Sequence, residues 1–136
     1  MMAFIAVKYH EDHHNRPLVE TIAAALEHHG VGSRCIARDI EQWGACRFTP
    51  QVLMQHTFQA IDASAFIVID LTEKGVGLGI EAGYAYARQK PIVVIGRTGP
   101  AISTTLTGVA QHMFLYTHLD DLVGYFEQII ARQEQL

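Results

Sequence analysis

A glutamate that follows a glycine-rich segment is the feature of this sequence best suited to chemistry. Gly75, Gly77 and Gly79 alternate with other residues shortly before Glu81. Glycines allow the backbone to approach a ligand closely, and the free amides of a helix start offer a site for an anion or a hydroxyl group. We predict a helix from about Ile80, which places Glu81 in its first turn, with its carboxylate directed at the same crevice. The helix dipole alone also favours a glutamate there.

Other residues have types and positions that suit a partner for Glu81. Asp70 ends an apolar run and is the best candidate by position, although it is equally suited to capping the next turn. His56 and His10 are alternative proton donors, because histidine titrates near neutral pH. The candidate substrate-binding residues are Tyr9, which would lie over a sugar or base, His10, Gly75, Gly77, Gly79 and Arg97, which would neutralise a phosphate.

The elements that must position these residues alternate between strand and helix patterns. Short apolar runs predict strands at 3–7, 65–71, 91–96 and 113–116, with a weaker one at 35–37. Helical patterns cover 16–29, about 50–63, 80–89 and 120–135, with a short helix within 98–110, and 39–47 is expected to be a loop. This alternation predicts a single α/β domain with a doubly wound, five-stranded parallel sheet and helices on both faces.

In such a fold ligands bind outside the carboxyl ends of the strands, near the point where the strand order reverses. That rule gathers three segments around one predicted cleft. They are Tyr9 and His10, the stretch 70–79, and the stretch 97–99. The glycine-rich segment follows the third predicted strand, so it is not the dinucleotide-binding fingerprint, which follows the first.

The stretch VGLGIEAGYAYARQKPIVVI at 76–95 resembles the signature of the nucleoside 2-deoxyribosyltransferase family. It is equally similar to the related 2-deoxynucleoside 5-phosphate N-hydrolases. The resemblance implies a flavodoxin-like fold and cleavage of a nucleoside or nucleotide N-glycosidic bond, by hydrolysis or base transfer. It also implies that Glu81 attacks or stabilises the anomeric carbon of the sugar. A homodimer or higher homo-oligomer is expected on the same ground, and no cofactor.

The resemblance covers roughly 53–108 and has clear departures. The stretch 102–108 is similar to a segment of the hydrolases whose serine contacts a substrate phosphate across the dimer interface, a role that falls on Ser103. Ser103 also suits an ordinary helix cap. Aspartates of the family are replaced by Thr57 and Gly75, and the N-terminal loop at 8–16 lacks the glycines of the hydrolases.

Composition excludes several classes of function. The chain has 136 residues, 18% of them charged, and a net charge of −4, which argues against a protein that grips nucleic acid. No apolar stretch is long enough for a membrane span, and no secretion signal is evident, so we predict a cytoplasmic protein with Cys35 and Cys46 reduced. His10, His13 and His14 lie close together, but their spacing matches no familiar catalytic metal site, and no functional metal is predicted.

Two other functions remain open at this point. The N-terminal half, FIAVKYHED followed later by RDIEQWG, resembles TIR-like domains, some of which cleave NAD at its nicotinamide bond with a glutamate. The replaced aspartates, at Thr57 and Gly75, instead favour a non-catalytic nucleotide-binding module on the same fold. Release of nicotinamide would indicate the first, and binding without turnover the second.

Overall fold

A computed structural model describes residues 1–99 and 101–132, and its centre is a five-stranded, all-parallel sheet. The strands are β1 (Met2–Ala6), β2 (Gly32–Arg34), β3 (Phe66–Asp70), β4 (Ile92–Arg97) and β5 (His112–Tyr116). Their order in the sheet is β2-β1-β3-β4-β5, which is the flavodoxin-like order. The predicted doubly wound parallel sheet is confirmed.

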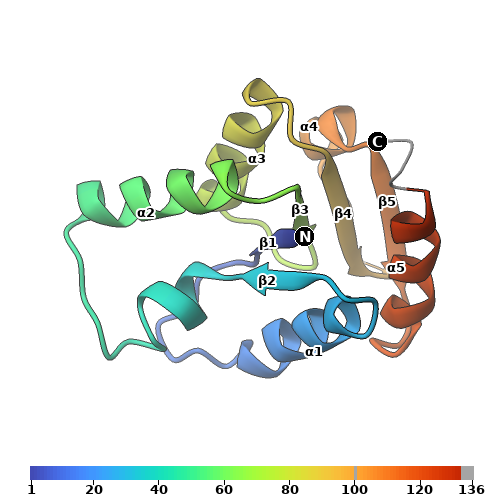
Figure 1. Ribbon diagram of the computed structural model, residues 1–136, viewed down its shortest axis with the longest axis horizontal. Helices are drawn as coiled ribbons and strands as arrows, with labels where there is room; N and C mark the ends of the chain where they lie inside the picture. Colours follow the sequence, from blue (N-terminus) through green and yellow to red (C-terminus); the bar gives the residue numbers. More distant parts are fainter. Residues whose placement is uncertain (100, 133–136) are drawn as a thin grey trace.

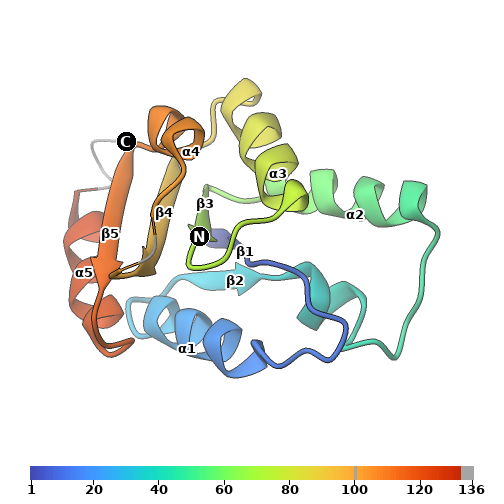
Figure 2. The same cartoon turned by 180° about the vertical axis from the view of Figure 1, so that it is seen from behind.

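Helices cover both faces of this sheet (Figures 1 and 2). On one face α1 (Arg16–Glu27) and α5 (Asp121–Ala131) pack together over one apolar cluster. On the other face α2 (Pro50–Asp62), α3 (Val76–Ala87) and α4 (Thr104–Val109) cover a second cluster. Because every residue of β3 is buried, the alternation of its side chains divides the core between the two faces.

The ends of several elements follow local signals read from the sequence. Thr49 caps α2 by accepting a hydrogen bond from the Val52 amide at 3.3 Å, and Pro50 occupies the first turn. Gly30 has a φ of +77°, which glycine adopts readily, and it follows the end of α1. The predicted end of the last helix, at 135, lies outside the described residues.

The second strand and the segment after it differ from the sequence prediction. The prediction put a strand at 35–37 and a loop at 39–47, but β2 ends at Arg34 and a five-residue π-helix, η1 (Ile36–Ile40), follows. Cys35 is buried, and its amide donates to the Asp39 carboxylate at 2.9 Å. That bond from the turn competes with further strand pairing, which explains why the strand stops early.

The start of α3 also differs from the prediction. The helix begins at Val76, not near Ile80, because Gly75 is its extended N-cap and the residues after it are already helical. Glu81 therefore lies in the second turn, and the prediction that it lies in the first turn is wrong. The helix exposes the first-turn amides one turn earlier than expected, about 6 Å along its axis.

The strand order creates a crevice at one edge of the sheet. The connection after β1 leads to α1 on one face, whereas the connection after β3 leads to α3 on the other. The two connections part above the carboxyl ends of these neighbouring strands. Figures 1 and 2 both show α2 extending beyond the sheet beside this crevice. Among the described residues, no helix is long and apolar enough to cross a membrane.

Candidate active site

A cavity of about 410 Å³ lies beside the carboxyl end of β1. This volume is within the range of pockets that bind small ligands. Five parts of the chain form its wall: β1 with the loop after it, Val19 of α1, the segment around η1, the middle of α2, and the start of α3. A smaller cavity of about 250 Å³ adjoins it, and the two share Val7, Lys8, Tyr9, Gly77 and Glu81. Of the three segments that strand order was expected to gather, the main cavity is lined by Tyr9 and His10 and by Gly77, whereas Asp70 and Arg97 line a separate cavity.

Glu81 lines both cavities and is the most perturbed acid of the site. Burial raises the pKa of its carboxyl from 4.5 to about 8. Desolvation is the sole cause, so within the described chain no cation or hydrogen bond offsets it. A carboxyl that is mostly buried in a cavity wall, and that no protein group satisfies, is suited to interact with a bound ligand.

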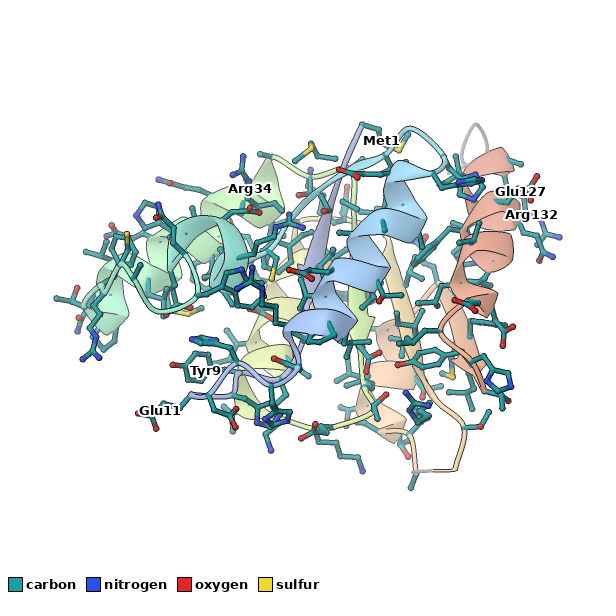
Figure 3. All side chains as sticks on the ribbon, turned by 90° about the horizontal axis from the view of Figure 1, so that it is seen from below. Met1, Tyr9, Glu11, Arg34, Glu127 and Arg132 are labelled. Atoms are coloured by element: carbon teal, nitrogen blue, oxygen red, sulfur yellow. The ribbon has the colours of Figure 1, made fainter. Side chains whose placement is uncertain are left out.

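The loop between β1 and α1 brings cationic and aromatic groups to the cavity. The cavity is lined from this loop by Lys8, Tyr9, His10 and His13. The side-chain amide of Asn15 donates a hydrogen bond to the Lys8 carbonyl at 2.7 Å, which holds the loop in place. Figure 3 shows Tyr9 on this loop at the rim of the molecule, where 60% of its side chain is exposed. Tyr9 and His10 both line the cavity, and their role in binding a substrate stays a prediction.

The segment after η1 contributes Glu41 to the cavity wall, and nearby Trp43 packs against the β1–α1 loop. The Trp43 ring meets His13 edge-on at 5.6 Å between centroids, and the Arg16 guanidinium lies 5.0 Å from its centre. Gln42 and Trp43 both have positive φ values, of 50° and 54°. Non-glycine residues rarely adopt this conformation, and such backbone strain concentrates at functional sites.

Gly77 leaves room in the cavity because it has no side chain, whereas its backbone is ordinary helix. The positive-φ glycines of the described chain are Gly30, Gly44 and Gly99, so the glycines before Glu81 make no left-handed turn. A Cβ added at Gly77 would meet no atom within 4 Å, because the residue faces open cavity.

Asp70 lies in a different environment from Glu81. Its carboxylate accepts hydrogen bonds from the Tyr116 hydroxyl at 2.6 Å and from the Thr72 amide at 2.9 Å. It is 3% exposed and faces a separate cavity of about 110 Å³ together with Arg97. Both carboxylate oxygens are therefore occupied in holding the end of β3 and the turn after it.

The remaining predicted residues lie outside the main cavity. His56 packs edge-on against Phe48 at 5.1 Å, while its neighbour Thr57 lines the cavity. Arg97 lies 5.6 Å above the Tyr116 ring, and Ser103 caps α4 by accepting a hydrogen bond from the Leu106 amide at 3.3 Å. Of the glycines, Gly75 and Gly77 border the adjoining cavity, whereas Gly79 borders neither cavity.

Glu41 is a lining residue that the sequence analysis missed. It follows η1, lines the same cavity as Glu81, and burial raises the pKa of its carboxyl despite the opposing effect of nearby His13. The segment was expected to be a loop, so no pattern indicated the direction of this side chain. Only the packing of η1 beside α2 brings the second carboxyl to the site.

Comparisons with known proteins agree with this fold. No protein-family model matches the sequence, and no curated protein matches it. Solved structures do match. The CMP N-glycosidase BcmB of Clostridium botulinum has a TM-score of 0.67 at 17% identity, over 94% of this chain and 99% of that one. A 2-deoxyribosyltransferase of Bacillus psychrosaccharolyticus has a TM-score of 0.71 at 12% identity, over 90% of both chains. A conserved protein of Enterococcus faecalis V583 has a TM-score of 0.67 at 14% identity, over 94% of this chain and 99% of that one.

The raised pKa of Glu81 predicts a measurable effect on stability. The folded protein binds the Glu81 proton up to about pH 8, whereas the unfolded chain releases it near the ordinary value of 4.5. The free energy of unfolding therefore falls as the pH rises from 4.5 to about 8, by at most about 1.4 kcal/mol per pH unit. Glu81→Gln removes the ionisation, so we expect the variant to gain free energy of unfolding relative to wild type between about pH 5 and pH 8.

Urea denaturation at several pH values measures this difference. The control is Glu127→Gln, at an exposed position of α5 (Figure 3), which should follow the wild type throughout. A Glu81→Gln variant whose stability runs parallel to wild type over the whole range would show that the carboxyl is not perturbed.

Proposed function

We propose that the protein cleaves the N-glycosidic bond of a nucleoside or nucleotide, with Glu81 as the catalytic carboxylate. The observation that carries the proposal is a mostly buried glutamate, unsatisfied by protein groups, in the wall of a cavity of ligand size. Support comes from the fold, which is shared with a CMP N-glycosidase and a 2-deoxyribosyltransferase. The resemblance of the segment around Glu81 to nucleoside 2-deoxyribosyltransferases points to the same residue.

The proposed reaction has two steps at the anomeric carbon. The Glu81 carboxylate attacks C1′, the bond from C1′ to the base nitrogen breaks, and the base leaves with the electron pair of that bond. The sugar is then an ester of Glu81, as in retaining glycosidases. Attack of water on C1′ releases the free sugar and gives hydrolysis, whereas attack by a second base gives transfer.

Glu81 must lose its proton before it attacks, and an imidazole of the same cavity wall, His10 or His13, accepts it. Its pKa of about 8 means that the carboxyl is largely protonated at neutral pH in the empty cavity. Positive charge develops on the sugar as the base departs, and a nearby positive charge favours the ionised carboxylate. The ionised Glu81 carboxylate and the positively charged sugar therefore attract each other most strongly in the transition state. An interaction that is strongest there lowers the barrier to reaction.

The departing base takes up a proton, and several residues are placed to supply it. Glu41, His10 and His13 line the same cavity as Glu81. His56 and Asp70, the donors considered from the sequence, lie against Phe48 and Tyr116 instead. We therefore propose that the proton comes from the wall formed by η1 and the β1–α1 loop.

A phosphate on the substrate would meet the same loop. Lys8 brings a cationic group to the cavity, and His10 and His13 bring imidazoles that can donate hydrogen bonds, whereas Arg97 faces the smaller cavity beside Asp70. We propose a nucleoside 5-phosphate or its nucleoside as substrate. These are metabolites of the cell interior, so we also propose that the protein acts in the cytoplasm.

Homo-oligomers are part of the proposal. Apolar side chains of α3 and β5 are exposed on one face of the sheet: Val76, Ile80, Tyr86, Met113 and Leu115. Exposed apolar surface of this kind marks an interaction site. The short helix α4, capped by Ser103, covers the same face, where the resemblance expects the serine to meet a partner's substrate.

Light scattering coupled to gel filtration tests the oligomer. We expect a dimer or larger assembly for wild type, and dissociation for Ile80→Glu, because a buried unpaired charge is costly. Glu127→Gln on α5 is the control and should leave the assembly intact. A monomeric wild type at micromolar concentration would contradict the proposed assembly.

The function is tested by incubating the purified protein with nucleosides, deoxynucleosides, their 5-phosphates and NAD, and by separating released base by chromatography. We expect base release from at least one nucleoside or nucleotide, reduced about a thousandfold or more in Glu81→Gln, which keeps the volume but not the nucleophile. Release of nicotinamide alone would support the NAD glycohydrolase alternative. Binding without any release, unchanged in Glu81→Ala, would instead support a non-catalytic nucleotide-binding module.

Gly77→Ala separates the ligand site from the stability of the helix. The added methyl group meets no protein atom and projects where a ligand would lie. We expect nucleotide affinity to fall about tenfold or more while the protein stays folded, since alanine favours a helix over glycine by roughly 0.5–1 kcal/mol. Gly124→Ala in α5, which also meets no atom within 4 Å, is the matched control for both melting temperature and affinity.

A further inference from the structure

Two imidazoles and a carboxylate from different loops converge beside the main cavity. His10 and His14 belong to the loop between β1 and α1, and Glu73 belongs to the loop between β3 and α3. One potential ligand atom of each residue lies within 4.8 Å of those of the other two. His10 also lines the main cavity, so the cluster lies at its border.

We propose that His10, His14 and Glu73 bind a zinc ion that links these two loops. Two imidazole nitrogens and a carboxylate oxygen are a ligand set that zinc favours, and water completes the tetrahedron. Zinc ligands at about 2.0–2.1 Å from the metal lie about 3.3 Å from one another. Side-chain rotations that move the ligand atoms by about an ångström are enough to close the site.

The contact between His10 and Glu73 has the spacing of two metal ligands. His10 Nε2 lies 3.0 Å from Glu73 Oε2, yet it is shielded from solvent and makes no hydrogen bond among the described residues. The oxygen therefore lies beside, not along, the direction in which this nitrogen would donate or bind. A cation in front of His10 Nε2 accepts the lone pair of that nitrogen and at the same time contacts Glu73 Oε2.

His14 is oriented by a second carboxylate in the way that metal-binding histidines are. Its Nδ1 lies 2.7 Å from Asp12 Oδ1, and its backbone amide donates to the same oxygen at 3.1 Å. With the proton on Nδ1, donated to Asp12, the lone pair of Nε2 is free for a metal. The His10 and His14 rings are 3.9 Å apart, so both imidazoles belong to one site.

The proposed ion has a structural consequence at the cavity. The β1–α1 loop carries Tyr9, and the β3–α3 loop leads into the helix that carries Glu81. An ion held by both loops fixes their separation at the border of the cavity. Of the three ligands only His10 is also a candidate donor of the proton to the base, and with His10 on the ion that proton comes from Glu41 or His13.

Zinc binding is measured on untagged protein by competition with a chromophoric chelator. We expect one Zn²⁺ per chain with micromolar or tighter affinity, and a rise in melting temperature with added zinc. His14→Ala and Glu73→Ala should each weaken binding at least tenfold, and Asp12→Asn, which touches only the orienting bond, should weaken it by about tenfold. Co²⁺ should give the visible absorption of a four-coordinate site in wild type and not in His14→Ala.

The matched control is His28→Gln, which alters one of another adjacent pair of histidines, at the end of α1. It should bind zinc as wild type does. Equal affinity in wild type, His14→Ala and Glu73→Ala would overturn the proposal, and so would binding only at millimolar zinc. Nucleotide turnover is not the readout, so a failure of the glycosidase proposal leaves this test unaffected.

Discussion

The parting of two connections above β1 and β3 is the constraint on which the candidate site depends. Right-handed crossovers carry the chain from β1 to α1 on one face of the sheet and from β3 to α3 on the other. Neither connection can fill the space between them, so a crevice stays open at the carboxyl ends of the strands. The cavity, the β1–α1 loop and the proposed zinc ligands all lie along this opening.

The environments of the two acids Asp70 and Glu81 show how position determines the use of a carboxyl group. Asp70 is more buried, but a hydroxyl and an amide satisfy its oxygens, so it holds the end of a strand. Glu81 has cavity on one side and apolar surroundings on the other, and its pKa is raised to about 8. This carboxyl destabilises the folded protein. Functional sites often contain residues that lower stability in this way.

The cavity wall combines rigid and adaptable parts. Glu81 and Thr57 project from helices that pack on the sheet and on each other. The β1–α1 loop, by contrast, is held by the Asn15 bond, by the contact of His13 with Trp43, and by the proximity of His10 to Glu73. A ligand that enters this cavity therefore meets a fixed acid on one side and a loop whose position depends on a few polar contacts on the other.

Periodicity and capping signals in the sequence determined the fold, since apolar strands and amphipathic helices need only local patterns to be identified. The sequence also indicated Glu81 and the loop with Tyr9 and His10 as neighbours of one crevice. Tertiary structure alone decided which carboxyl stays unsatisfied, because the Asp70 bond to Tyr116 joins positions 46 residues apart. It also decided that Glu41 lines the cavity and that Glu73 lies 3.0 Å from His10, since the π-helix and the loops place them by long-range packing, which no local pattern encodes.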